Sequence, residues 1–355
     1  MNITNEPVDV IVIGAGQAGL ACSWHLRQQN LKFLILDAEQ RPGGHWRNYY
    51  DSLRLFSPAA YSSLPGMPFP ADPGHYPLRD EVVRYLEQYA DAFQLPIRQS
   101  VRVEQVRKEN GLFLLQASDG QHFNSKALVV CTGGFNRPFI PAVKGLERFR
   151  GQRLHSADYR NVDGFRDQRM VVIGAANSAV QIAYELARVS SVVLATKASI
   201  RFVPQKILGV DFHAWLKWTG LEKTRWLNDQ STPVLDDGTY RRALRQGLFV
   251  RRPMFKEVTP TGVIWADGQH TEVDGLVFAT GFRPNASFLE GLHKPGGEGL
   301  LAQHNGQAEH VPGLYFVGLP KQRNFASATL RGVGPDASHI LPSLMRFIRK
   351  QGAVM

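Results

Sequence analysis

The sequence predicts an α/β protein built from two Rossmann-like dinucleotide-binding domains, with the second inserted in the first. Glycine-rich segments begin at Gly14 and Gly174, 160 residues apart, and each follows a short apolar run. A strand near residues 314–317 and a helix from about Asp336 come after the second unit, where they have nothing to complete. We therefore expect them to return to the first domain. Two nucleotide sites in one chain indicate a protein that passes electrons from one cofactor to another.

The expected elements alternate between strand and helix in both units. Continuous apolar runs are typical of parallel strands covered on both faces, and a stripe of apolar residues at helical spacing predicts each helix. In order, we expect strand 8–13, helix 17–29, strand 31–36, an irregular stretch 41–78, helix 79–93, strands 101–106, 113–117 and 127–131, then strand 170–173, helix 177–189, strand 191–196, an irregular stretch 203–256, strands 262–265, 276–280 and 314–317, and the final helix.

Composition describes an ordinary globular protein. The 355 residues suffice for about two domains, and 43% are hydrophobic and 20% charged. No apolar stretch approaches the roughly 20 residues of a membrane helix, and the polar N-terminus does not resemble a targeting signal. We therefore expect a cytoplasmic protein that does not act at a membrane.

Several classes of chemistry lack their sequence signatures. The two cysteines, Cys22 and Cys131, are not spaced as a C-x-x-C redox dithiol, and the eleven histidines show no metal-ligand spacing, so we expect no metal site. The net charge is +10, with a basic stretch from Arg241 to Lys256. That stretch would be solvated surface or a subunit contact, or would assist a phosphorylated cofactor, or would bind nucleic acid. No nucleic-acid reader motif accompanies it, and we expect no nucleic-acid partner.

The first glycine-rich segment assigns a separate role to each glycine. Gly14 makes the tight turn, Gly16 lets the backbone approach a pyrophosphate, and Gly19 allows close packing of helix on strand. The following helix directs its N-terminus at the phosphates. Asp37 ends the second strand, where a carboxylate accepts hydrogen bonds from a ribose diol and repels a 2′-phosphate. This site is predicted to take FAD or NAD, and not NADP.

The second glycine-rich segment departs from the pattern. Ala176 stands where the middle glycine is expected, and no acid ends the following strand. Lys197 and Arg201 could instead pair with a 2′-phosphate, with a hydrogen bond from Thr196 or Ser199. We predict an NADPH site with modest discrimination against NADH, because lysine is a point charge and not a bidentate fork. Lys197 would otherwise be an exposed lysine at a strand end.

A third motif, F-x-G-x-x-x-H-x-x-x-Y-R, occupies residues 149–160. Together with the two glycine-rich segments, Gly-Gly-His-Trp-Arg at 43–47, Phe-Ala-Thr-Gly-Phe-Arg-Pro at 278–284 and the segment 313–318, it makes the chain resemble the class B flavin-dependent monooxygenases. These are the flavin-containing monooxygenases with their Baeyer–Villiger and N-hydroxylating relatives. In that family the third motif lies at the junction of the two domains, so His155 would have either a chemical role or a structural one.

The resemblance implies the cofactors and the domain boundaries. FAD would occupy a domain of residues 1–155 and 285–355, and NADPH, with NADH also accepted, a domain of residues 156–284. Backbone amides near Thr329 and Leu330 would meet the flavin. The expected cofactor-binding residues are Gly14, Gly16, Gly19, Asp37, Ala38, Gly44, Trp46, Val103, Thr132, Gly133, Gly174, Ala176, Asn177, Ser178, Thr196, Lys197, Arg201, Thr280, Gly281, Thr329 and Leu330.

The resemblance also implies chemistry on the flavin itself. Hydride from NADPH would reduce FAD, and reduced flavin with O₂ would give a C4a-(hydro)peroxyflavin. That species would oxygenate small lipophilic substrates by sulfoxidation, N-oxygenation or Baeyer–Villiger oxidation of ketones. Bound oxidised NADP, held by Asn177, Ser178 and Lys197, would screen it. We expect Phe56, Asn177 and His155 to be the residues nearest to the chemistry.

Phe56 is the main departure from the family pattern. The family usually places an asparagine in the segment that here reads Leu-Arg-Leu-Phe-Ser-Pro, at 53–58, and Phe56 aligns with it. Phe56 would still exclude water, and Ser57 or Asn324 would have to supply the missing donor. An NAD(P)H oxidase or flavin reductase that releases peroxide, or a non-catalytic nucleotide-binding redox sensor, are therefore alternatives. If exposed, Trp215, Trp218 and Trp226 would permit a homodimer interface or a hydrophobic substrate channel, and otherwise they would be core residues.

Overall fold

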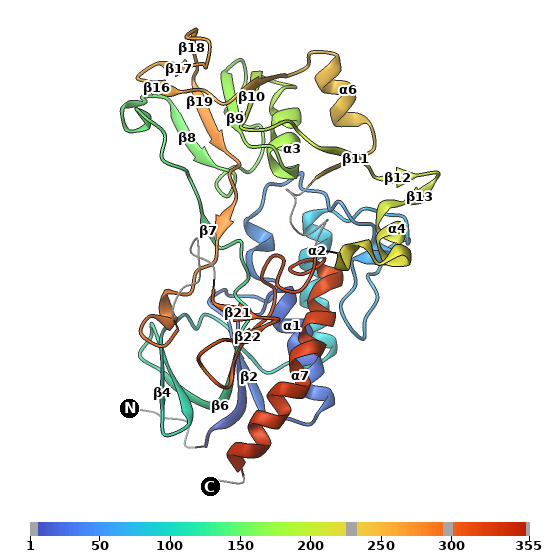
Figure 1. Ribbon diagram of the computed structural model, residues 1–355, viewed down its shortest axis with the longest axis vertical. Coiled ribbons are helices and arrows are strands. Elements are labelled where there is room, and N and C mark those ends of the chain that lie inside the picture. The colour runs from blue at the N-terminus through green and yellow to red at the C-terminus, as the bar shows by residue number, and fades with distance from the viewer. Residues whose placement is uncertain (1–5, 225–232, 294–300, 353–355) are drawn as a thin grey trace.

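The computed structural model describes residues 6–224, 233–293 and 301–352. Figure 1 shows two bodies, each built on its own sheet and joined by two extended crossings of the chain. The predicted fold class, with a second unit inserted in the first, is confirmed. No helix in these described ranges is long and apolar enough to cross a membrane.

The first sheet surrounds the first glycine-rich segment. Its parallel core has the strand order β23–β6–β1–β2–β3, and the central residues Val10, Ile11 and Val12 have no exposed surface. The continuous apolar sequence of β1 is thus explained by cover on both faces. The strands are β1 (Val8–Ile13), β2 (Phe33–Leu36), β3 (Ile97–Arg98), β4 (Val103–Glu109), β5 (Leu112–Ala117), β6 (His122–Val130), β21 (Gln303–His304), β22 (Gln307–Ala308) and β23 (Leu314–Phe316).

Helices α1 (Gln17–Gln28), α2 (Arg79–Ala92) and α7 (Leu330–Gly352) share one apolar core with this sheet. In Figure 1 the long red helix α7 runs beside α1. α7 begins at Leu330, and the prediction of a start near Asp336 was wrong. The helix carries Pro335 in its interior, although proline is most often found at the first helical position.

The second sheet is parallel throughout, in the order β15–β10–β9–β19–β8. Its strands are β8 (Gln152–His155), β9 (Arg169–Ile173), β10 (Ser191–Thr196), β15 (Val250–Pro253) and β19 (Gly275–Phe278). Helix α3 (Asn177–Leu186) packs on β9 and β10, and α6 (Thr239–Arg245) packs beside α3. A small antiparallel sheet of β16 (Glu257–Thr259), β17 (Gly262–Ile264) and β18 (His270–Glu272) extends this unit.

The two crossings pair with one another. β7 (Arg137–Pro138) lies antiparallel to β20 (Phe282–Arg283), so the outgoing and returning chains run side by side between the sheets. β8 belongs to the second sheet, although residues 152–155 were predicted to lie in the first unit. β8 precedes the second glycine-rich segment and joins that sheet as an edge strand, a pairing that a single sequence does not display.

Residues 203–256 were expected to be irregular, but much of this stretch is regular. It contains β11 (Phe202–Pro204), β12 (Lys206–Ile207), β13 (Val210–Asp211), α4 (Phe212–Thr219), β14 (Val234–Asp236) and α6. We call the part from Lys206 to Lys223 the arm, because it leaves the second unit and reaches the first (Figure 1). Short 3₁₀ turns η1 (Gly44–Asn48), η2 (Ala59–Tyr61), η3 (Leu146–Arg148), η4 (Leu221–Lys223) and η5 (Ser287–Leu289) complete the described elements.

Candidate cofactor and active-site cavity

A cavity of about 1210 Å³ lies where the two sheets face one another. Its volume exceeds the range of about 300–1,000 Å³ of ordinary small-ligand sites. It brings together most of the residues that the sequence predicted for cofactors or chemistry. These are Gly14, Gly16, Asp37, Ala38, Gly44, Trp46, Phe56, Val103, Thr132, Gly133, Gly174, Ala176, Asn177, Ser178, Lys197, Arg201, Thr280, Gly281, Thr329 and Leu330.

The glycines of the first segment have different surroundings. A Cβ on Gly14, whose φ is +104°, would lie 2.9 Å from the carbonyl oxygen of Cys131, and a Cβ on Gly19 would overlap the carbonyl oxygen of Gly14. Gly19 therefore serves packing and does not line the cavity. A Cβ on Gly16 would meet only the Cα of Gly44, at 3.8 Å, so this position is open toward the cavity.

Both fingerprint helices begin without a side-chain cap. Gly16 precedes α1 and Ala176 precedes α3, and neither helix has a side chain that accepts from its first backbone N–H groups. Such an uncapped N-terminus carries partial positive charge and unpaired donors, which suit a phosphate. The structure thus provides an anion-binding end on each side of the cavity.

Asp37 directly follows β2 and is 4% exposed. Its carboxylate accepts hydrogen bonds from the backbone N–H of Ala15 and from that of Glu39, at 2.7 Å for Glu39. Burial raises the pKa of the Asp37 carboxyl, and these two hydrogen bonds oppose the rise. The carboxylate is held in place by the fingerprint turn, with lone pairs left for a ribose diol.

Gln17, which was not among the predicted site residues, connects three walls of the cavity. Its side-chain oxygen accepts from Trp46 Nε1 at 3.0 Å, and its amide nitrogen donates to the carbonyl oxygen of Ala328 at 2.5 Å. Ala328 has a φ of +68°, a conformation that a residue with a Cβ adopts only at a cost. Gln17 occupies a variable position of the fingerprint, so no sequence signal marked it.

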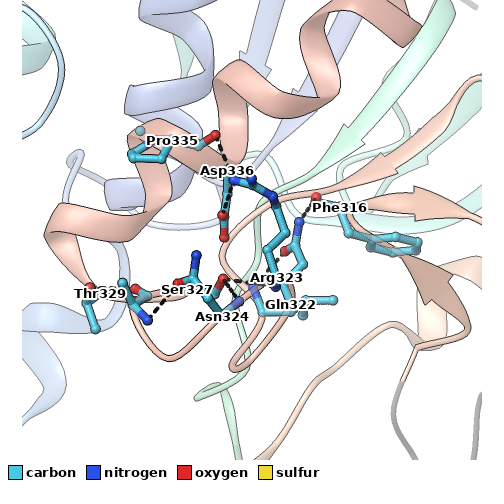
Figure 2. A network of polar contacts seen from close by, with 12 residues as sticks. Phe316, Gln322, Arg323, Asn324, Ser327, Thr329, Pro335 and Asp336 are labelled. Atoms are coloured by element: carbon cyan, nitrogen blue, oxygen red, sulfur yellow. Dashed lines mark hydrogen bonds and ion pairs between the residues drawn. The ribbon is translucent and has the colours of Figure 1, made fainter. Parts of the chain in front are cut away.

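The loop before α7 forms another wall and is held by a polar network (Figure 2). Arg323 donates to the carboxylate of Asp336 at 3.1 Å and to the carbonyl oxygen of Pro335 at 3.2 Å, and its backbone N–H donates to Ser327 Oγ at 3.1 Å. Burial raises the pKa of the Asp336 carboxyl, whereas Ser327 and Arg323 lower it. This network fixes the backbone that presents Ala328 and Thr329 to the cavity.

Asn324 belongs to the same network and does not replace the asparagine that Phe56 displaces. Its side-chain oxygen accepts from the backbone N–H of Ala326 at 2.8 Å, and it does not line the cavity. Ser57 does line the cavity, with its hydroxyl 3.0 Å from Ser62 Oγ. Of the two residues predicted to supply the missing hydrogen-bond donor, Ser57 lines the cavity and Asn324 does not.

Asn177 lines the cavity, but both ends of its amide are bound to backbone. The nitrogen donates to the carbonyl oxygen of Pro233 at 3.1 Å, and the oxygen accepts from the N–H of Leu235 at 3.3 Å. Asn177 thereby ties the start of α3 to β14.

The same fingerprint needs glycine at position 174, where φ is +145° and a Cβ would overlap the carbonyl oxygen of Ala279.

The carboxyl end of β10 is basic. Lys197, Ser199 and Arg201 line the cavity there. Thr196 does not, because it is buried and its hydroxyl accepts from Arg251 Nε at 2.8 Å. Of the two hydroxyls predicted to contact the cofactor, the structure therefore favours Ser199 over Thr196. The sequence marked Arg251 only as part of the basic stretch, and the structure shows that β15 places it beside β10.

His155 is 2% exposed and lies beside the returning chain. Its Nδ1 accepts from the backbone N–H of Ala157 at 3.0 Å, so Nε2 carries the hydrogen that it donates to the carbonyl oxygen of Gly281, at 2.9 Å. Burial lowers the pKa of His155, and the bond to Gly281 opposes that effect. Both nitrogens are occupied and His155 does not line the cavity, which favours the structural one of its two predicted roles, the positioning of Gly281.

Phe56 is half-buried and lines the cavity. Its ring is stacked on that of His213 in the arm, with centroids 6.0 Å apart and planes at 17°. Among the tryptophans proposed for an interface, Trp218 is 67% exposed and packs edge-on against Trp215, while Trp226 lies outside the described residues.

Known proteins share this arrangement. The family model of the pyridine nucleotide-disulphide oxidoreductases matches residues 11–217. An uncharacterized CzcO-like oxidoreductase of Geobacillus kaustophilus is 34% identical, over 95% of this chain and 98% of that protein. The probable indole-3-pyruvate monooxygenase YUCCA1 of Arabidopsis thaliana is 30% identical, over 79% of this chain and 77% of its own length.

A solved structure extends the likeness to three dimensions. The flavin-containing monooxygenase from Stenotrophomonas maltophilia is 34% identical, with a TM-score of 0.87 over 98% of this chain and 99% of that one. The comparisons agree with the motifs and with the fold of two nucleotide-binding units. This chain is therefore an oxidoreductase of the pyridine nucleotide-disulphide oxidoreductase family and belongs, within it, to the class B flavin-dependent monooxygenases.

Proposed function

We propose that this protein is an FAD-dependent, NAD(P)H-consuming monooxygenase that inserts one oxygen atom of O₂ into small lipophilic substrates. One observation carries the proposal: both glycine-rich segments open into a single cavity of about 1210 Å³. Two nucleotides bound there would bring their reactive rings together between the sheets. Sulfides, amines and ketones are the substrate classes that we infer.

The residues present fit FAD in the first unit. Gly16 leaves an open approach at the uncapped end of α1, and Asp37 offers its carboxylate to a ribose diol. Gln17 holds Trp46 and Ala328 around the space that the isoalloxazine ring would fill. When bound, the flavin would accept a hydride from the nicotinamide cofactor and activate O₂, which protein side chains do not do.

The second unit fits a phosphorylated nicotinamide cofactor. The uncapped end of α3 faces the cavity, and Lys197 and Arg201 line it where the following strand ends. Arg251, bound to Thr196, adds a third cation close to this end of β10. We therefore propose preference for NADPH, with NADH also accepted because Lys197 is exposed and presents a single charge.

The protein's own task is to position and enclose. Phe56, Phe325 and Leu330 place apolar surface in the cavity wall, where they would exclude water. Ser57 supplies a hydroxyl beside Phe56. Because Phe56 cannot donate a hydrogen bond, release of peroxide by an NAD(P)H oxidase is the second candidate function.

Stopped-flow spectroscopy of the purified flavoprotein distinguishes the two functions. The protein is reduced anaerobically with NADPH and mixed with oxygenated buffer, with and without a sulfide, amine or ketone. A transient absorption band before the oxidised flavin spectrum returns, together with oxygenated product, is expected. Direct reoxidation with one peroxide formed for each NADPH would contradict the proposal, and so would a protein that retains no flavin.

A further inference from the structure

The arm is attached to the first unit by a polar cluster in which His213 is buried and Asp211 and Tyr76 are half-buried. Asp211 caps α4, since one carboxylate oxygen accepts from the backbone N–H of His213 at 2.7 Å and from His213 Nδ1 at 2.9 Å. The other oxygen accepts from the hydroxyl of Tyr76 at 2.5 Å, and Tyr76 precedes α2 in the first unit. Burial raises the pKa of the Asp211 carboxyl, but the bonds from His213 and Tyr76 outweigh it, so the net pKa is lowered.

A second attachment lies at the other end of the arm. Glu222 forms an ion pair with Arg331 in the first turn of α7, and its carbonyl oxygen accepts from the backbone N–H of Phe325 at 3.2 Å. Phe325 lines the cavity. The arm is therefore fixed on both sides of His213, and it touches two walls of the cavity without lining it.

His213 is 1% exposed and makes ring contacts with two aromatic residues of the first unit. Phe56 is stacked on it at 6.0 Å and 17°, and Tyr61 at 5.9 Å and 28°. Its Nε2 is buried without a hydrogen-bond partner. An unpaired buried nitrogen costs free energy that a phenylalanine or leucine at this position would not.

The hydrogen bond to Asp211 gives the His213 imidazole a fixed orientation, which an apolar ring would lack. Because Nδ1 donates to a carboxylate that is itself held by Tyr76 and by the helix cap, the plane of the ring is fixed in rotation. The Phe56 ring packs on that fixed plane and faces the cavity. A hydrogen-bonded stacking partner thus accounts for a histidine at position 213.

From this geometry we infer that His213 is a positioning residue, which sets the Phe56 ring in the cavity wall through the Tyr76–Asp211–His213 cluster. The inference rests on the proposed function, because the wall matters only where oxygen transfer competes with loss of peroxide. The arm belongs to the second unit, so the cluster also couples the nicotinamide side of the molecule to the wall over the flavin.

Three variants test the role of His213. His213→Ala removes the ring, His213→Phe keeps a ring but loses the bond to Asp211, and Lys217→Gln changes an exposed residue of the same helix as a matched control. We expect His213→Ala to lower the fraction of NADPH oxidation coupled to product at least about threefold, with the rate of flavin reduction unchanged. His213→Phe should fall between the wild type and His213→Ala.

A double variant separates positioning from general support of the fold. If His213 acts through Phe56, Phe56→Ala should uncouple the enzyme to a similar degree, and combining it with His213→Ala should add nothing. Additive losses in the double variant, or coupling in His213→Ala equal to that of Lys217→Gln, would overturn the inference. Failure of both His213 variants to fold would also overturn it, because the residue would then serve stability.

Hydrogen–deuterium exchange of residues 53–62 gives a readout that needs no turnover. In both the apoprotein and the flavin-loaded protein, exchange there should rise at least about fivefold in His213→Ala and stay unchanged in Lys217→Gln. Unchanged exchange in His213→Ala overturns the inference even if the wild type makes product. Raised exchange in a protein that forms only peroxide supports the positioning while the proposed function fails.

Discussion

Gly16 and Gly19 stand three positions apart in one fingerprint, yet different forces require them. A methyl group on Gly19 would overlap the carbonyl oxygen of Gly14, so the strand-to-helix turn itself would have to open. A methyl group on Gly16 would meet only the Cα of Gly44 at 3.8 Å, and the φ of −76° at Gly16 suits any residue. Gly16 therefore leaves room for a ligand, whereas Gly19 leaves room for the protein's own backbone.

Alanine substitutions should separate these two duties. We expect Gly19→Ala to cost about 3 kcal/mol or more of unfolding free energy, because backbone must move. Gly16→Ala should leave stability within about 0.5 kcal/mol but weaken FAD binding about tenfold, because its methyl group occupies the pyrophosphate approach. Urea unfolding of the apoproteins and FAD titration measure both, and equal stability of the two variants would contradict the assignment.

Local residues of the site were predictable from the sequence, and residues that meet across the fold were not. Gly14, Gly16 and Asp37 belong to one strand–turn–helix–strand unit whose geometry follows from the chain alone. Gln17 escaped notice because its partner Ala328 is 311 residues away. His213 was missed for a similar reason, since neither ring on which it stacks is near it in sequence.

At the scale of elements, two neighbouring parallel strands build the basic end of the second site. β10 leads to Lys197 and Arg201, and β15 places Arg251 against Thr196. The sequence predicted the first of these strands from its glycine-rich segment. It could not place the second, because the pairing of β15 with β10 depends on sheet order and not on a local pattern.

Neutralising Lys197 should affect the phosphorylated cofactor selectively. We expect Lys197→Ala to raise the KM for NADPH about tenfold and to leave that for NADH within about twofold, since a charge-assisted hydrogen bond contributes about 1.5–3 kcal/mol. Arg245→Ala on α6, within the same basic stretch, is the control. Steady-state kinetics with both cofactors measures the effect, and an equal rise for NADH would show that Lys197 does not read the phosphate.

At the scale of the whole molecule, the two bodies depend on the paired crossings β7 and β20. His155 braces this region, because its Nε2 donates to Gly281 just before β20. The family motif at residues 149–160 predicted a domain junction here, and the structure shows the hydrogen bond from His155 to Gly281 at that junction. The order of strands in each sheet, by contrast, rests on long-range pairing that a single sequence does not display.

Because burial lowers the pKa of His155, its contribution to stability at this junction depends on pH. A base whose pKa is lower in the folded state than the unfolded value of about 6.5 favours unfolding once the pH falls below that value. Its stabilising contribution is therefore complete above about pH 6.5 and is lost on acidification. We expect His155→Gln to lower the free energy of unfolding by about 1 kcal/mol at neutral pH, because glutamine replaces the hydrogen bonds of His155 imperfectly. Between about pH 7.5 and pH 5.5, the unfolding free energy of this variant should decline less steeply than that of the wild type.

Urea unfolding at several pH values tests this expectation. His310→Gln, at an exposed position, serves as the control and should follow the wild type throughout. Parallel pH profiles of His155→Gln and the wild type would show that His155 does not contribute to the acid sensitivity.

The insertion of one unit in the other also dictates an order of events during synthesis. β23 and α7, which complete the first sheet and the wall around Thr329, are the last described elements to leave the ribosome. The second unit, by contrast, is complete once β19 has emerged. A nascent chain would thus be able to fold its nicotinamide side while the flavin side still lacks a central strand neighbour and its longest helix. We therefore expect flavin loading to follow the emergence of β23 and α7, so that residues 314–352 would act as the checkpoint for an active enzyme.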